Sequence, residues 1–155
     1  IDAVLNSVLT LYAARMKNSG VTVEFRNSDA VPLLCYDGEL RQIFANLISN
    51  AFDAMRGRGG RLILRSRNAT RWSRGVRGVR ITVADSGMGM DKTTLTKIFE
   101  PFFTTKGISG TGLGLWVTLQ LINSNRGDIR VRSNNREGRQ GTVFSLFFPH
   151  AQVES

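Results

Sequence analysis

The sequence contains little that could cross-link the chain or carry it through a membrane. Cys35 is the only cysteine among 155 residues, so no internal disulfide can form, which fits a reducing, cytoplasmic compartment. No apolar run approaches the roughly 18 residues that cross a bilayer, and the chain does not start with a signal-peptide pattern. With 41% hydrophobic and 21% charged residues, the composition predicts one globular domain, residues 1–155, without membrane contact.

Two common phosphate-binding loops are also missing. No GxxxxGK[ST] motif occurs, which excludes a P-loop, and Leu115 stands where the GxGxxG fingerprint of a dinucleotide-binding fold needs its third glycine. His150 is the only histidine, and it has no acidic neighbour. We interpret it as an exposed residue without a catalytic role.

Acidic residues are absent from one long segment. Residues 56–80 contain nine arginines and no acid, and the whole chain carries a net charge of +9 with a pI near 11.0. Such a segment can bind nucleic acid or an acidic partner. It can also be a solvated sheet edge and loop, which the sequence alone favours.

The pattern of apolar residues predicts a two-layer α/β sandwich with helices on one face of a mixed sheet. We expect Asp2 and Asp37 to cap the first two helices. A basic loop is expected over 71–78, and 135–141 is expected to join a closing hairpin. The predicted helices span 2–16, 40–56 and 111–124, and the predicted strands span 21–26, 61–70, 79–84, 129–133 and 142–148. The last helix is apolar on most sides, so we expect it to be buried.

The helix over 40–56 combines a broad apolar face with one polar stripe. Gln42, Asn46, Asn50 and Asp53 form the stripe at helical spacing. An unpaired amide away from water costs about 1–3 kcal/mol, so these side chains face either solvent or a ligand. The apolar face comprises Leu40, Ile43, Phe44, Leu47, Ile48, Ala51 and Met55.

Three loops contain further polar or glycine-rich patterns. Asp85 ends a predicted buried strand and needs a donor, either a backbone amide or the exocyclic amine of a purine. The segment 98–106 has three phenylalanines, which could clamp a mobile loop to the core or simply pack in it. The segment 110–115, GTGLGL, opens a helix with exposed amides, an arrangement that binds phosphate.

Taken together and in this order, the segments resemble the catalytic and ATP-binding domain of bacterial sensor histidine kinases. That domain belongs to the superfamily of DNA gyrase, the Hsp90 chaperones and the MutL proteins. Residues 42–55 resemble its N box, 85–90 its G1 box, 99–106 its F box and 110–115 its G2 box. The resemblance covers nearly the whole chain. It implies a Bergerat-type sandwich: a mostly antiparallel sheet of about five strands, about three helices on one face, and an ATP lid.

The resemblance also implies the role of individual residues. Asn50 would bind Mg²⁺, Asn46 would line the phosphate site as the catalytic residue, and Asp85 would accept a hydrogen bond from the adenine amine near Thr142. The segment between the G1 and G2 boxes would be the lid. The remaining residues implied in nucleotide binding are Asp53, Gly87, Gly89, Met90, Phe99, Thr104, Thr105, Lys106, Gly110, Thr111, Gly112, Leu113, Gly114 and Leu115.

Two positions depart from the commonest family pattern. Ser86 stands where Asn is commoner, and Asp53 stands where many relatives have Lys or Arg, so Lys106 is the nearest replacement cation. The sequence Phe52-Asp-Ala-Met55 resembles the nitrogen-regulation subgroup. In the ATPase branches a Glu usually occupies the position of Asn46, and an amide cannot act as a general base.

The resemblance therefore implies a domain that binds Mg-ATP and donates the γ-phosphoryl group to a histidine on a separate dimerisation domain, in two-component signalling with a response regulator. Because no histidine suits the acceptor role and Ile1 replaces an initial Met, we expect a fragment whose acceptor and sensor domains precede it. We expect this fragment to be monomeric. A nucleotide-binding scaffold or ATPase-type module of the same superfamily, and a basic nucleic-acid-binding module, are the alternatives.

Overall fold

The fold is built on one five-stranded sheet. The computed structural model describes residues 1–27, 32–33, 35–71, 73–107 and 110–150. Its strands are β1 Val21–Asn27, β2 Gly60–Arg71, β3 Val76–Asp85, β4 Asp128–Asn134 and β5 Gly141–Pro149. They lie in the order β1-β2-β3-β5-β4, with β1 parallel to β2 and every other neighbouring pair antiparallel.

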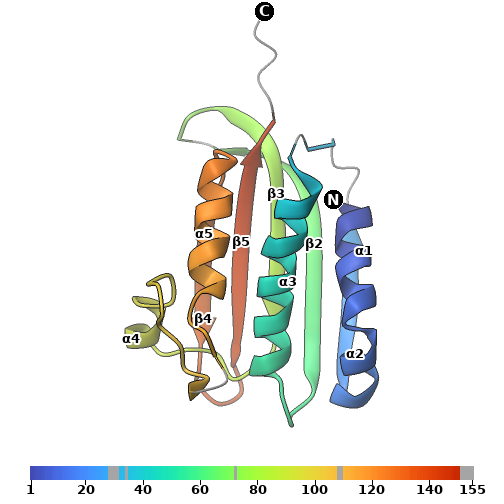
Figure 1. Ribbon diagram of the computed structural model, residues 1–155, viewed down its shortest axis with the longest axis vertical. Coiled ribbons are helices and arrows are strands. Elements are labelled where there is room, and N and C mark those ends of the chain that lie inside the picture. Colours follow the sequence, from blue (N-terminus) through green and yellow to red (C-terminus); the bar gives the residue numbers. More distant parts are fainter. Residues whose placement is uncertain (28–31, 34, 72, 108–109, 151–155) are drawn as a thin grey trace, which may run out of the picture.

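The long helices all lie on one face of this sheet (Figure 1). They are α1 Asp2–Leu11, α2 Ala13–Ser19, α3 Asp37–Ala54 and α5 Gly114–Ser124, and the short α4 Lys92–Leu95 stands apart from them in the segment between β3 and α5. The predicted two-layer α/β sandwich is therefore confirmed. No helix among the described residues is long and apolar enough to span a membrane.

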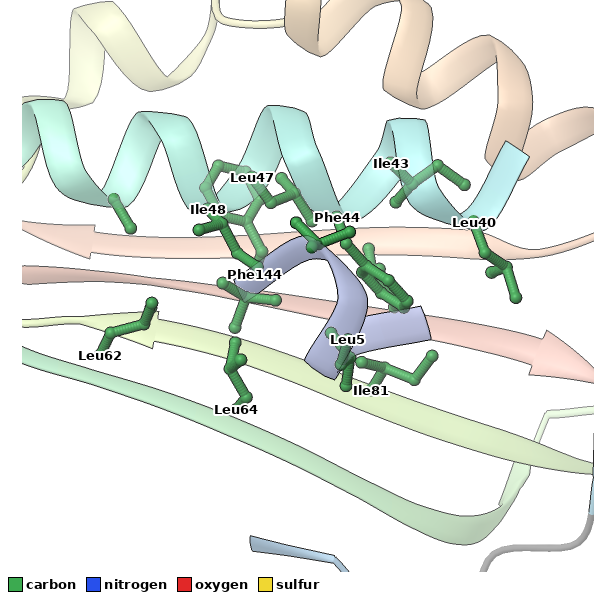
Figure 2. Packing of buried hydrophobic residues seen from close by; sticks show 14 of the residues in the cluster. Leu5, Leu40, Ile43, Phe44, Leu47, Ile48, Leu62, Leu64, Ile81 and Phe144 are labelled. Atoms are coloured by element: carbon green, nitrogen blue, oxygen red, sulfur yellow. The ribbon is translucent and has the colours of Figure 1, made fainter. Parts of the chain in front are cut away.

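The core lies between α3 and the sheet. All seven residues of the predicted apolar face of α3 are buried, among them Phe44, Leu47 and Ile48. Alternation along β2 turns Leu62 and Leu64 toward them, and α1 adds Leu5 (Figure 2). Because these side chains come from elements far apart in the sequence, α3 is held against the middle of the sheet.

The first predicted helix is two helices. The chain turns at Tyr12, with φ −96° and ψ 4°, so that α1 ends and α2 begins. The Tyr12 ring stacks on Phe52 of α3 at 5.8 Å between centroids, and its hydroxyl donates to the carbonyl oxygen of Ala45 at 3.3 Å. This tertiary packing overrides the continuous helical period of residues 2–16.

The two predicted aspartate caps are wrong. Asp2 and Asp37 are the first residues of α1 and α3, whose N-caps are Ile1 and Tyr36 without a side-chain hydrogen bond. In the first turn, a carboxylate can still stabilise a helix by its charge, since the N-terminus is the positive end of the helix dipole.

The basic loop predicted over 71–78 is also wrong. β2 continues through Arg71 and pairs with β3 from Val76 onward, so most of the arginine-rich segment lies in two paired strands. His150, predicted to be exposed, is half-buried, and its backbone N–H donates to the carbonyl oxygen of Arg77 at 3.0 Å.

The last helix is shorter and more exposed than predicted. α5 begins at Gly114 instead of Thr111, and only Thr118 and Ile122 are fully buried in it. Trp116 is 37% exposed. Only one side of the helix therefore packs on the protein, although most of its residues are apolar.

We expect Phe44→Ala to lower the free energy of unfolding by about 3–5 kcal/mol, because it empties a site in the middle of the core. Phe44 is 0% exposed. The same substitution at Phe102, which is 74% exposed, should change stability by less than about 0.5 kcal/mol. Urea unfolding of both variants measures this difference, and equal losses would contradict the placement of Phe44.

Candidate functional site

A cavity of about 440 Å³ is lined by residues of α3, the start of α5, strands β3 and β5, and the segment between β3 and α5. It brings together fifteen of the eighteen residues that the sequence placed in a nucleotide site. They are Asn46, Asn50, Asp53, Asp85, Gly89, Met90, Thr104, Thr105, Lys106, Gly110, Thr111, Gly112, Gly114, Leu115 and Thr142.

Three candidate residues lie outside the lining of this cavity. Gly87 is buried, and its N–H donates to the Asp85 carboxylate at 2.8 Å. Phe99 packs against the core. The N–H of Leu113 donates a hydrogen bond to the Thr111 hydroxyl at 3.3 Å. These residues shape the loops around the cavity. For all eighteen candidates, direct contact with a nucleotide stays a prediction.

Seven further residues line the cavity that were not among the candidate site residues. Ser49 lies three residues after Asn46 and four before Asp53, so the helical period of the polar stripe could have identified it. Phe144 lies two residues after Thr142 on the same face of β5, so the alternation of side chains along the strand could have identified it. The other additional lining residues are Ala54, Met88, Thr94, Ile98 and Phe103.

Asp85 is the acidic group at the sheet end of the cavity. It lies opposite Thr142 in the β3–β5 register. Burial raises the pKa of Asp85 to about 6, although the backbone N–H groups of Gly87 and Thr142 act against this shift. A half-buried carboxylate with such a pKa is poorly solvated, so a ligand amine would be a favourable donor to it.

The loop after Asp85 is fixed to the closing hairpin. The N–H of Met90 donates to Ser133 at 2.8 Å, and Ser133 lies 2.7 Å from the buried Thr142 hydroxyl. Gly89 has φ +70°, and a side chain there would lie 1.9 Å from the carbonyl oxygen of Asn134. Only glycine therefore allows this approach, which holds the loop beside Asp85.

Asn46 connects α3 to α5. Its side-chain amide donates to the carbonyl oxygen of Gly114 at 3.0 Å and to the Thr118 hydroxyl at 3.1 Å. These bonds hold the first turn of α5 at the cavity. The amide of Asn46 is thus a positioning group in this arrangement, and it has no basic form at neutral pH.

At the C-terminal end of α3, one lysine contacts two of the predicted site residues. The Lys106 ammonium lies 2.9 Å from the Asn50 side-chain oxygen and 2.6 Å from the Asp53 carboxylate. Asp53 also pairs with Arg15 at 3.0 Å and with Arg56 at 2.9 Å. Burial raises the pKa of Asp53, but the hydrogen bonds and charges of Lys106 and Arg15 outweigh this and hold that pKa below its usual value.

The glycine-rich loop leads directly into α5. Gly112 has φ +71°, and a side chain there would lie 2.3–2.6 Å from the backbone of Phe102. The loop can therefore fold tightly under the preceding segment. α5 then begins at Gly114 in the cavity wall, and the amides of a helix N-terminus, together with its dipole, favour an anion there.

Comparison with known proteins agrees with this geometry. The family described as histidine kinase-, DNA gyrase B-, and HSP90-like ATPase matches residues 36–152. Sporulation kinase E of Bacillus subtilis is 32% identical over 153 residues, which are 98% of this chain and 19% of that protein. Across the first curated relatives, this chain spans only 19–33% of their length.

Solved structures of histidine kinases share the fold, and two of them illustrate the match. The catalytic domain of the histidine kinase ThkA, in a nucleotide-free form, has a TM-score of 0.79 and 27% identity, covering 96% of this chain and 91% of that one. Full-length ShkA in complex with AMPPNP has a TM-score of 0.76 and 29% identity, covering 97% and 31%. The chain belongs to the family of histidine kinase-, DNA gyrase B- and HSP90-like ATPases, and its fold is that of the histidine kinase catalytic domain.

Proposed function

We propose that this domain binds ATP with Mg²⁺ and donates the γ-phosphoryl group to a histidine on a separate dimerisation domain. The observation that supports this most directly is the single cavity that has a half-buried acid, Asp85, at one end and the Asn50–Lys106–Asp53 cluster with the start of α5 at the other. A purine needs the first kind of group and a polyphosphate needs the second.

At the adenine end, Asp85 would accept a hydrogen bond from the exocyclic amine. Its ionised form only accepts, so it would discriminate against guanine, which presents a carbonyl oxygen at the same ring position. Thr142 lies across the β3–β5 register from Asp85. Its hydroxyl is 2.7 Å from Ser133, so it is held in place beside the base.

At the phosphate end, the residues fit a magnesium ion that is shared with the nucleotide. Asn50 offers one amide oxygen, and no group of three or more His, Cys, Asp or Glu side chains that could hold a metal occurs among the described residues. Magnesium in nucleotide sites commonly takes one or two protein oxygens and completes its shell with phosphate and water. The bound metal supplies charge neutralisation for phosphoryl transfer.

Lys106 and Asp53 would then work as a pair. Since Lys106 contacts the Asn50 oxygen that we assign to the metal, binding requires the lysine to turn away from Asn50. Asp53 keeps it close to the cavity, where its ammonium can approach the phosphates. In this way a lysine of the lid replaces the cation that many relatives have on α3.

Asn46 favours transfer to an imidazole over transfer to water. An amide cannot take a proton from an attacking water molecule, whereas a histidine side chain is already nucleophilic. The ATPase-type alternative is therefore less well supported than the kinase.

The remaining assignments concern the protein of which this domain would be part. We place residues 1–155 as one catalytic domain, monomeric and without membrane contact of its own, in a cytoplasmic location. Its partners would be a dimerisation and phosphoacceptor domain of the same protein and a response regulator. We also propose, from the Phe52-Asp-Ala-Met55 sequence alone, that the chain is most similar to the nitrogen-regulation subgroup.

We expect Asp85→Asn to weaken ATP and ADP binding at least tenfold, because one acceptor site of the carboxylate is lost; tenfold corresponds to about 1.4 kcal/mol. Stability at pH 7 should not fall, since the substitution also removes a poorly solvated charge. Titration calorimetry and urea unfolding measure the two quantities. An equal loss of affinity for ATP and GTP would contradict the adenine contact.

The same contact predicts a pH dependence. Adenosine, which has no phosphate to titrate, should bind with constant affinity above about pH 7 and more weakly as the pH falls toward 5. The reason is that a proton added near the raised pKa of Asp85, about 6, replaces an acceptor by a hydroxyl. In Asp85→Asn the profile should be flat, and a flat profile in the unaltered domain would oppose the assignment.

We expect Asn50→Ala to abolish the effect of Mg²⁺ on ADP affinity while leaving metal-free binding within about threefold, because the amide oxygen is the proposed metal ligand. Calorimetry with Mg²⁺ and with EDTA separates the two effects. Asn123→Ala, the same substitution at an exposed site of α5, is the matched control. Undiminished Mg²⁺ dependence in Asn50→Ala would rule out this ligand.

A further inference from the structure

The face of the sheet that the helices leave uncovered is rich in arginine. Along β2, Leu62 and Leu64 turn toward the helices, so the alternation turns Arg65 and Arg67 to the opposite side. The same alternation places Arg80 of β3 there. None of these residues takes part in the proposed nucleotide site, which lies on the helical side of the sheet.

The strand register arranges the arginines in two rows. Arg67 lies directly opposite Arg80 across β2 and β3. On the other side of β5, Arg130 and Arg132 of β4 lie opposite Ser145 and Val143. Phe147 of β5 lies opposite Arg80, with Asp128 of β4 beyond it, whereas Ser145 lies between Thr82 and Arg130. Since neighbouring strands are about 4.8 Å apart, β3 and β4 stand about 10 Å apart across β5, and the β4 arginines are offset along the strands from Arg80.

A hollow of about 300 Å³ lies between these rows. Five arginines line it, and the only acid in its lining is Asp128. Asp128 pairs with Arg71 at 2.7 Å, and the Arg71 guanidinium stands 4.7 Å from the centroid of the Phe147 ring. The lining residues are Arg67, Arg71, Arg80, Thr82, Asp128, Arg130, Arg132, Val143, Ser145 and Phe147.

The hollow therefore keeps a large excess of positive charge. One acid balances one of five guanidinium groups, and no ion pair joins the other four to an acid of the described residues. Like charges directly opposite each other, such as Arg67 and Arg80, destabilise a strand pair. An acidic ligand would remove this cost.

We propose that this hollow binds an extended, Asp- and Glu-rich segment of a partner protein. In an extended peptide, every second side chain lies on the same side, and these side chains repeat about every 7 Å. Carboxylates on the side that faces the sheet can therefore reach both arginine rows from a peptide that lies between the rows. The planar guanidinium group matches a carboxylate in two parallel hydrogen bonds. The hydroxyls of Thr82 and Ser145 provide further donors from the floor of the hollow.

The floor of the hollow favours a peptide over the other polyanions. Single-stranded nucleic acid is commonly held by bases stacked on exposed aromatic rings, but Phe147, the one ring in the lining, is 2% exposed and lies beneath Arg71. A membrane surface is flat and takes up exposed apolar side chains, whereas this site is concave and its exposed apolar residue is Val143.

The test compares three fluorescent or light-scattering probes at low and raised salt. They are a peptide that alternates Glu and Ser, an oligothymidine with the same number of negative charges, and vesicles containing phosphatidylglycerol. We expect the peptide to bind most tightly and to lose at least about tenfold in affinity when NaCl rises from about 50 to about 300 mM. Tighter binding of oligothymidine or vesicles, or no peptide binding at low salt, would overturn the proposal.

A pair of charge-reversed variants tests the site. Arg67→Glu with Arg130→Glu should weaken peptide binding at least about tenfold. Arg136→Glu with Arg139→Glu makes the same charge change at exposed residues of the β4–β5 turn and should weaken it less than threefold. Equal losses would show that net charge alone attracts the peptide, which would refute the hollow as the site. Unchanged ADP affinity in both variants confirms that each is folded, and it is a readout independent of the peptide.

Discussion

The packing of α3 on the sheet is the constraint on which the cavity depends. Phe44, Leu47 and Ile48 are buried against β2, β3 and β5, which fixes the rotation of the helix about its axis. Helical geometry then turns Asn46 and Asn50 away from the sheet centre and into the cavity. Burial of the apolar face of α3 is therefore sufficient to orient the polar stripe on the same helix toward the cavity.

The segment between β3 and α5 is held to that helix through charge. Asp53 pairs with Lys106 of this segment, Arg15 of α2 and Arg56 beyond α3. Three cations around one half-buried carboxylate leave an excess of positive charge where polyphosphate would enter, and the lysine is the cation that also contacts Asn50. An acid at this position therefore gathers cations at the end of the cavity where we propose that the phosphates bind, and these cations outweigh its own negative charge.

Much of this arrangement could be predicted because the sequence pattern is local. The apolar face of α3 and the strands follow from periodicity, and the fifteen cavity residues are implied by the resemblance of four motifs, in order, to the histidine kinase domain. The Tyr12 break could not be predicted, since stacking on Phe52 is a contact across forty residues of sequence. The loop predicted over 71–78 is wrong for a related reason. Arginine and glycine are typical of a loop, and only the pairing of β2 with β3 shows that Arg71 and Val76 are strand residues.

Strand β5 links the two sides of the molecule through its alternation. Thr142 and Phe144 face the cavity proposed to bind nucleotide, whereas Val143 and Ser145 face the arginine hollow on the other side. Because side chains alternate with a period of two, a shift of register by one residue would exchange both sets at once. The buried Phe144, Leu146 and Phe148 prevent that shift. The hydrophobic core thus fixes the orientation of both surfaces, and a partner in the hollow would contact the same strand as the nucleotide without competing for its side chains.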